Sequence, residues 1–237
     1  MSAQRENGRF FLLQGLYWAA YCVLFGYTVT IFGAYGYSAQ VCGILTTLQY
    51  VVLLVAQPIY GYLMDNIVSP KWFFVGLSAA AVVGAFFLPW AFAQSQWVVI
   101  GYFLLLSLFN FCGSGVVDTW CIEVANEVHG TDYGLMRSGG SIFYAITGLV
   151  AGYIIAPLGI RSLFFIHAAL CGLGLLLALG LPDPWKLQKR EKLPHEDGEH
   201  RPSFASAVLL LMKNRAFVVY TLCMTCYYFA SRATQVY

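Results

Sequence analysis

Two opposite charges interrupt the apolar segments of this 237-residue chain and are the first candidates for binding chemistry. Asp118 is flanked by the apolar runs GVV and TWCI, and Arg137 stands in YGLMRSGGSIFY. A charge costs roughly 2.5 to 3.5 kcal/mol at the centre of a membrane-spanning helix unless it pairs or faces a watery cavity. A guanidinium donates through a rigid fork and a carboxylate only accepts, so the two side chains could grip the same polar ligand.

Both charges also have a simpler interpretation. Arg137 is predicted near one end of its helix, where a long side chain can reach the headgroups and serve as an anchor. Asp118 lies roughly 30 Å along its helix from Trp97 at 1.5 Å per residue, so it too could stand close to the exit. The sequence leaves both interpretations open.

Three further polar residues in or beside apolar segments have weaker signals. Glu123 lies one helical turn before Glu127, and such pairs are usually solvated helix ends, with a role for Glu123 in gating or coupling as the alternative. Arg232 interrupts the last apolar segment too far inside for easy snorkelling, so it is a candidate for a transport pathway. His167 is alone in its segment, and we favour a packing role over a proton relay.

The elements that carry these residues are apolar runs of about twenty residues, the length of a membrane-spanning helix. Hydrophobic residues make up 59% of the chain and charged residues 10%, which is too little ionic surface for an ordinary soluble domain. The sequence therefore predicts an all-α protein integral to the membrane. We expect spans at 10–32, 41–64, 72–92, 97–125, 138–156, 163–181 and 216–237.

Composition argues against several functions. A net charge of +2 without a basic and aromatic stripe gives no sign of nucleic-acid binding. All seven cysteines lie in apolar segments, and the pair Cys223 and Cys226 has no redox context. Nucleotide-binding and metalloprotease motifs are missing. We therefore expect no enzyme activity, no cofactor and no metal.

Lys and Arg are distributed unequally between the predicted loops. Ten lie on the side of the N-terminus and of the long loop, whereas the opposite loops hold only Arg161. This asymmetry predicts a cytoplasmic N-terminus in the cell membrane, either a plasma or an inner membrane.

Domain organisation follows from one hydrophilic stretch. Residues 183–202 carry both signs of charge and are predicted to be a cytoplasmic linker after a six-helix bundle at 1–182. Residues 203–237 are expected to form an interfacial helix and a seventh span. We expect this last part to begin an incomplete second bundle, as in transporters built from two six-helix repeats.

The end of the second predicted span, QPIYGYLMD, has the composition of a moving helix pair. Pro58 loosens a helix, Gly61 permits close approach, and Asp65 stands where the helix leaves the membrane. At this point the chain resembles the major facilitator superfamily, through a Gly-x-x-x-Asp core at Gly61 and Asp65 and the basic Lys71 that follows. The resemblance implies a gating role for this segment.

A narrower likeness is to the lactose permease type, the oligosaccharide and proton symporters, and related permeases. Gln57, Pro58, Gly61 and Asp65 match one block, and YGLMRSGGSIFY from Tyr133 matches another. The resemblance implies that Asp118 and Arg137 bind solute hydroxyls and that Tyr144 stacks on the solute.

These observations predict a secondary transporter that moves a small polar, sugar-like solute by alternating access, coupled to protons. The expected partners are the solute, protons, the lipid bilayer and a missing C-terminal half. A seven-helix receptor or sensor is the alternative, opposed by the predicted cytoplasmic N-terminus and by the lack of a retinal-binding Lys in the last span.

Overall fold

The computed structural model describes residues 2–188 and 212–236, and within these ranges all regular secondary structure is helical. The chain divides into two compact units, Met1–Glu191 and Lys192–Tyr237, which are described separately. Six helical segments of the described residues are long and apolar enough to cross a membrane. The all-α class and the bundle of six spans are therefore as the sequence predicts.

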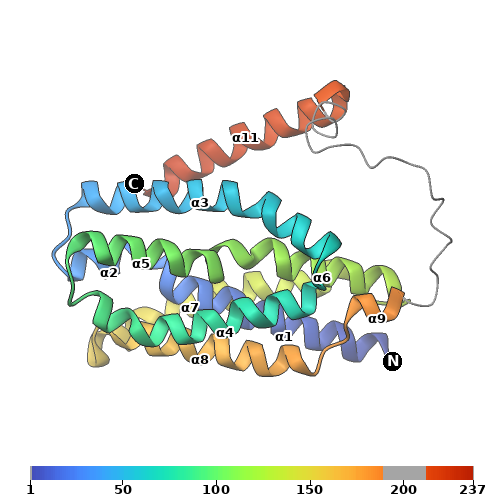
Figure 1. Cartoon of the computed structure of the whole chain (residues 1–237), viewed down its shortest axis with the longest axis horizontal. Helices are drawn as coiled ribbons and strands as arrows, with labels where there is room; N and C mark the ends of the chain where they lie inside the picture. Colours follow the sequence, from blue (N-terminus) through green and yellow to red (C-terminus); the bar gives the residue numbers. More distant parts are fainter. Residues whose placement is uncertain (1, 189–211, 237) are drawn as a thin grey trace. The chain divides into compact units, whose positions relative to one another are not determined.

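The first unit is a bundle of helices that run back and forth along a common direction (Figure 1). In chain order its elements are α1 (Ala3–Tyr21), the π-helical η1 (Cys22–Gly26), α2 (Thr28–Ala34), α3 (Ala39–Asn66), α4 (Pro70–Ala91), α5 (Gln96–Phe109), the 3₁₀-helical η2 (Phe111–Gly113), α6 (Ser114–Glu127), α7 (Tyr133–Leu158), α8 (Ser162–Leu179) and α9 (Pro184–Gln188).

Local sequence explains where several helices begin and end. The Ser38 hydroxyl accepts a hydrogen bond from the Val41 amide at 3.4 Å, and Asp132 accepts one from the Leu135 amide at 3.2 Å, so each caps the start of a helix. Pro70 opens α4, where its missing N–H is no loss. Gly159, with φ of 75°, ends α7 in a conformation that favours glycine.

The first span forms the centre of the bundle. Its apolar window is 61% buried, against 22% for α3 and 6% for α7. Phe10 of α1 packs edge-on against Trp120 of α6 with ring centroids 5.3 Å apart, and both side chains are fully buried. The faces of α3 and α7 therefore remain largely uncovered within this unit, whereas α1 is enclosed by its neighbours.

The predicted first span was wrong in its start and its continuity. Helix α1 begins at Ala3 rather than at residue 10, because its polar first turns have partners. The Asn7 side chain accepts a hydrogen bond from the Asp132 amide at 3.0 Å, and Glu6 pairs with Arg9 at 3.2 Å. The π-helical turn η1 then interrupts the span before α2.

The predicted fourth span, at 97–125, is not one continuous helix either. It is broken at Asn110–Gly113, which separates α5 from α6. Backbone groups inside a membrane require hydrogen-bond partners. Around the break the Asn110 carbonyl accepts from the Gly113 amide at 3.0 Å and from Tyr17 at 2.6 Å, Tyr60 donates to the Leu108 carbonyl at 2.6 Å, and Gln57 donates to the Cys112 carbonyl at 2.9 Å.

The second unit contributes one long helix, α11 (Arg215–Val236). It lies where the seventh span was predicted, but it is not one of the six segments that satisfy the length and hydropathy criteria. Polar residues at 221, 225, 231, 232 and 235 reduce its apolar character. The seventh span therefore stays a prediction, and the expected interfacial helix at 203–211 lies outside the described residues.

The predicted domain boundaries stay predictions as well. The linker expected at 183–202 begins with α9, which packs on the first unit. The Trp120 indole donates to the Pro182 carbonyl at 3.0 Å, and Asp183 is buried. Beyond residue 188 this linker falls outside the described part of the chain.

Candidate functional site

Asp118 and Arg137 meet between α6 and α7. The Arg137 Nε atom lies 3.4 Å from Asp118 Oδ1, and the side chains keep 31% and 28% of their exposure respectively. Pairing offsets part of the cost of placing charge within apolar helices, and the remaining exposure leaves room for a ligand. The structure thus brings together the two residues that the sequence singled out.

Two residues of α1 complete this cluster. Gln14, which is fully buried, donates from Nε2 to Asp118 Oδ1 at 2.8 Å, and the Trp18 indole donates to Gln14 Oε1 at 3.1 Å. The Arg137 guanidinium in turn lies over the Trp18 ring, 4.6 Å from its centroid. The four side chains form a closed ring of contacts across α1, α6 and α7, which we call the charged ring.

Glycines of α7 make this arrangement possible. A Cβ at Gly139 would overlap the carbonyl oxygen of Phe11, so α1 and α7 approach closely there. At Gly140 a Cβ would collide with Trp18 and lie 2.7 Å from Arg137 Nη1. The helices approach each other closely at these two glycines, which leaves space for the Trp18 and Arg137 contact.

Aromatic rings continue from the charged ring along the same side of α1. Tyr144 is 39% exposed and lies edge-on to Trp18, with centroids 6.3 Å apart, and 6.4 Å from Tyr21. Tyr21 stacks on Phe111 at 5.4 Å with an interplanar angle of 21°. Tyr144 is thus connected to the charged ring through Trp18.

The predicted gating residues lie elsewhere, towards the last turns of α3. Figure 1 shows that α3 bends within its C-terminal half, which contains Pro58, in keeping with the loss of a backbone hydrogen bond there. Asp65 is exposed. Among the described residues no atom lies within 4 Å of a Cβ placed at Gly61, so the close approach predicted for this glycine is not present within the unit.

Glu123 belongs to this second group rather than to the charged ring. It interacts electrostatically with Asp65, Asp183 and Glu127, all of like charge. Its Oε2 atom is buried and accepts no hydrogen bond from the described residues. Arg232, the remaining predicted pathway residue, lies on α11, where its side chain is outside the described part.

Lys71 has a different environment from that of a free loop cation. It is buried and donates to the carbonyls of Leu179 at 2.9 Å and Leu181 at 2.7 Å, just where α8 ends. A cation at a helix C-terminus satisfies carbonyls that have no intrahelical partner. This residue therefore joins the start of α4 to the end of α8.

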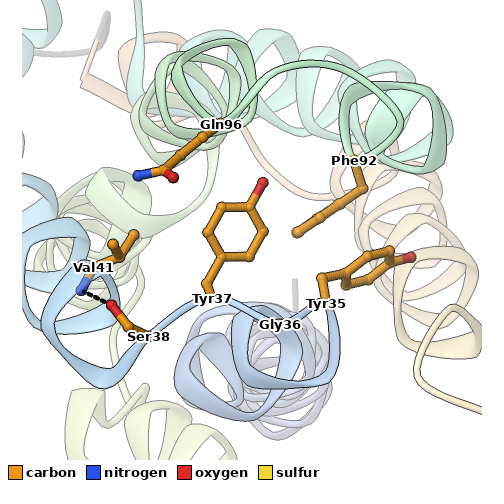
Figure 2. Close-up of a pocket in the computed structure, with 7 residues that line it drawn as sticks. All are labelled: Tyr35, Gly36, Tyr37, Ser38, Val41, Phe92 and Gln96. Atoms are coloured by element: carbon orange, nitrogen blue, oxygen red, sulfur yellow. Dashed lines mark hydrogen bonds between the residues drawn. The ribbon is translucent and has the colours of Figure 1, made fainter.

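A pocket of about 440 Å³ lies at the opposite end of the bundle, beside the turns after α2 and α4. Figure 2 shows Tyr37 projecting into it between Gln96 and Phe92, with Tyr35 beside Phe92. Tyr35 and Phe92 stack with centroids 4.1 Å apart, and the Tyr35 hydroxyl accepts from Arg161 Nε at 3.3 Å. No charged side chain lines this pocket, and it shares no residue with the charged ring.

Comparison with known proteins identifies the fold. The family model described as Major Facilitator Superfamily matches residues 10–237. The chain belongs to the Major Facilitator Superfamily. No curated protein sequence matches the chain.

A solved member of comparable fold is the nucleoside transporter NupG, in a crystal structure of its D323A mutant. The two share 15% identity with a TM-score of 0.65 over 93% of this chain and 53% of that one, so the present chain spans about half the length of NupG. At that identity the likeness shows the fold alone.

Membership of the Major Facilitator Superfamily supports a role in membrane transport and favours it over an enzyme, receptor or sensor. The narrower resemblance to the lactose permease type is not tested by this match. Sequence reasoning named Asp118, Arg137 and Tyr144 but missed Gln14. The signal that could have found it is a lone amide in the apolar run FFLLQGLYW, one helical turn before Trp18.

Proposed function

We propose that this chain is part of a secondary transporter that moves a small polar, sugar-like solute by alternating access, with protons as the coupling ion. The observation that supports it is the partly exposed pair of Asp118 and Arg137. A charge pair that keeps nearly a third of its exposure inside apolar helices needs a polar environment, and a solute pathway provides one.

Asp118 and Arg137 orient the solute in this proposal. The guanidinium fork donates to solute hydroxyls, and the carboxylate accepts from them. Tyr144 lies beside Trp18 of the charged ring and exposes enough ring surface to stack on a sugar ring. Polar contacts then fix the orientation of the solute, and the aromatic ring contributes apolar contact area.

Movement is assigned to the C-terminal half of α3 and its acidic neighbours. Pro58 supplies the bend, Gly61 leaves space for a helix of the other half of the transporter, and Asp65 caps that helix. Glu123 faces three like charges, so protonation of this carboxyl would relieve repulsion when the transporter changes state. Arg232 is proposed to contribute from α11.

The proposal also includes the orientation of the chain in the membrane and its packing against a C-terminal half. The excess of Lys and Arg near the N-terminus favours a cytoplasmic N-terminus in a plasma or inner membrane. The uncovered faces of α3 and α7 would pack against a C-terminal half, which would supply the second wall of the cavity.

Counterflow uptake tests the function. The full-length protein, reconstituted in liposomes, is loaded with unlabelled solute and exposed to labelled glucose, lactose or uridine. We expect accumulation of a sugar and loss of at least about tenfold of that signal in Asp118→Asn and in Arg137→Ala, because each removes one side of a buried charged contact.

A matched control uses a similar residue away from the pair. Arg5→Ala removes an exposed cation near the start of α1. This variant should transport normally. Wild-type uptake in Asp118→Asn and Arg137→Ala would contradict the assignment of this site. Uptake that does not change with a pH gradient would contradict the proton coupling.

A further inference from the structure

Gln14 occupies a position in the charged ring that no resemblance assigns to it. It is completely buried in α1 and is hydrogen-bonded both to Asp118 of α6 and to Trp18 of its own helix. Its amide also lies 3.4 Å from the Cys121 sulfur. A fully buried primary amide with every polar atom engaged is a costly group to keep in an apolar helix.

The orientation of this amide is determined by chemistry. An indole N–H can only donate, so the atom that faces Trp18 Nε1 must be the amide oxygen. The NH₂ group then points at Asp118 Oδ1, where it can only donate. By donating to the amide oxygen, Trp18 determines that the Gln14 NH₂ group faces Asp118 and donates to it.

The same carboxylate oxygen contacts both groups. Asp118 Oδ1 accepts a hydrogen bond from Gln14 Nε2 at 2.8 Å and forms an ion pair with Arg137 Nε at 3.4 Å. A hydrogen bond and an ion pair on one oxygen restrict rotation of the carboxylate and leave the rest of the guanidinium fork for other acceptors. The face of Trp18 holds the guanidinium from the other side.

We propose that Gln14 is a positioning residue, oriented by Trp18, that fixes the Asp118 carboxylate against Arg137 before solute binds. This inference rests on the proposed function. The role is pre-organisation: the site does not have to order these side chains when the solute arrives, so binding is tighter.

Two substitutions of nearly equal volume test the role. Gln14→Met keeps the packing and removes both hydrogen bonds, whereas Gln14→Glu keeps the acceptor for Trp18 and places a carboxyl beside Asp118. Other groups around this position are Cys121 from α6, Arg137 and Tyr133 from α7, and Tyr17 from α1. Two carboxylates at this distance must share a proton.

The measurement is counterflow KM and Vmax for the best solute among glucose, lactose and uridine, with thermal unfolding of the detergent-solubilised full-length protein at about pH 5 and about pH 8. In Gln14→Met, KM should rise roughly tenfold to a hundredfold with little change in Vmax, since a hydrogen bond to a charged group is lost. In Gln14→Glu, KM and Tm should approach wild-type values at the acidic pH and deteriorate at the alkaline pH, because only a protonated carboxyl can replace the amide donor.

The outcomes separate the two proposals. A wild-type KM in Gln14→Met, with uptake lost in Asp118→Asn, overturns the positioning role and leaves the proposed function intact. Equal defects of Gln14→Glu at both pH values also overturn it, because a purely steric role gives no pH dependence. If Gln14→Met does not fold, the pH comparison with Gln14→Glu decides alone. Normal uptake in Asp118→Asn removes the site itself.

Discussion

Two regions of this bundle place polar side chains within apolar helices, and they differ in how much of those side chains remains exposed. In the charged ring, Asp118 and Arg137 pair yet remain about a third exposed. Around His167 of α8, nothing is open: the imidazole is fully buried, its Nδ1 atom donates to the Ala20 carbonyl at 2.9 Å, and its Nε2 atom lies 3.6 Å from the Cys171 sulfur.

The contrast separates two uses of polarity in a membrane helix. A carbonyl only accepts, so the His167 Nδ1 atom must carry the proton, and Nε2 then accepts from the thiol. The ring is neutral and satisfied, as a packing histidine should be. The charged ring instead combines exposure with donors beyond those it uses internally, which is the character of a binding site.

The largest effect that would test this contrast is expected from Arg137→Lys. Lysine keeps the charge but loses the planar fork and its stacking on Trp18, so uptake should fall roughly tenfold to a hundredfold in counterflow. The matched change Arg5→Lys, at an exposed position, should have no effect. Full activity of Arg137→Lys would indicate that Arg137 serves as a membrane anchor and does not bind solute.

The next effect is on the packing that supports the charged ring. A methyl group at Gly139 cannot fit against the Phe11 carbonyl, so Gly139→Ala should separate α1 from α7 and cost about 1 to 3 kcal/mol of stability. Thermal unfolding in detergent measures this loss. Gly152→Ala on the same helix has open space around its Cβ and serves as the control, and equal behaviour of the two variants would contradict the close approach.

His167→Gln is the corresponding change in the closed region. Loss of well-placed hydrogen bonds in a buried site should lower stability by about 1 to 2 kcal/mol, whereas the KM for solute and the pH profile of uptake should remain those of the wild type. A shifted pH profile would show that His167 handles protons, and the contrast between the regions would no longer hold.

The smallest effect is expected from Lys71→Met. It removes two hydrogen bonds to the end of α8 but keeps most of the side-chain volume, so stability should decrease by about 1 kcal/mol. Transport kinetics should be unchanged at a temperature where the variant is folded. Lys213→Met, at an exposed position, is the control.

Periodicity and hydropathy predicted the helices well, because a bilayer permits few alternatives to a long apolar helix. They could not predict the interruptions η1 and η2. At η2 the carbonyls accept hydrogen bonds from Tyr17 and Gln57, which lie far away in sequence from these acceptors. The seventh span remained a prediction for a related reason, since the polar residues of α11 weaken its apolar signal.

The candidate site could be predicted in part from the sequence. A charge within an apolar run is conspicuous, so Asp118 and Arg137 stood out before their 3.4 Å contact was known. Gln14 carries no charge, and an isolated amide has many ordinary roles in a helix. Its importance comes from the geometry that places it against both Asp118 and Trp18, and only the folded chain contains that geometry.

The interruption between α5 and α6 has a consequence for biogenesis. Three carbonyls around it accept hydrogen bonds from the side chains of Tyr17, Gln57 and Tyr60, which all precede residue 108 in the chain. Because synthesis proceeds from the N-terminus, these donors leave the ribosome before the acceptors that need them. The side chains that donate to the interrupted α5–α6 segment are therefore synthesised before that segment enters the bilayer.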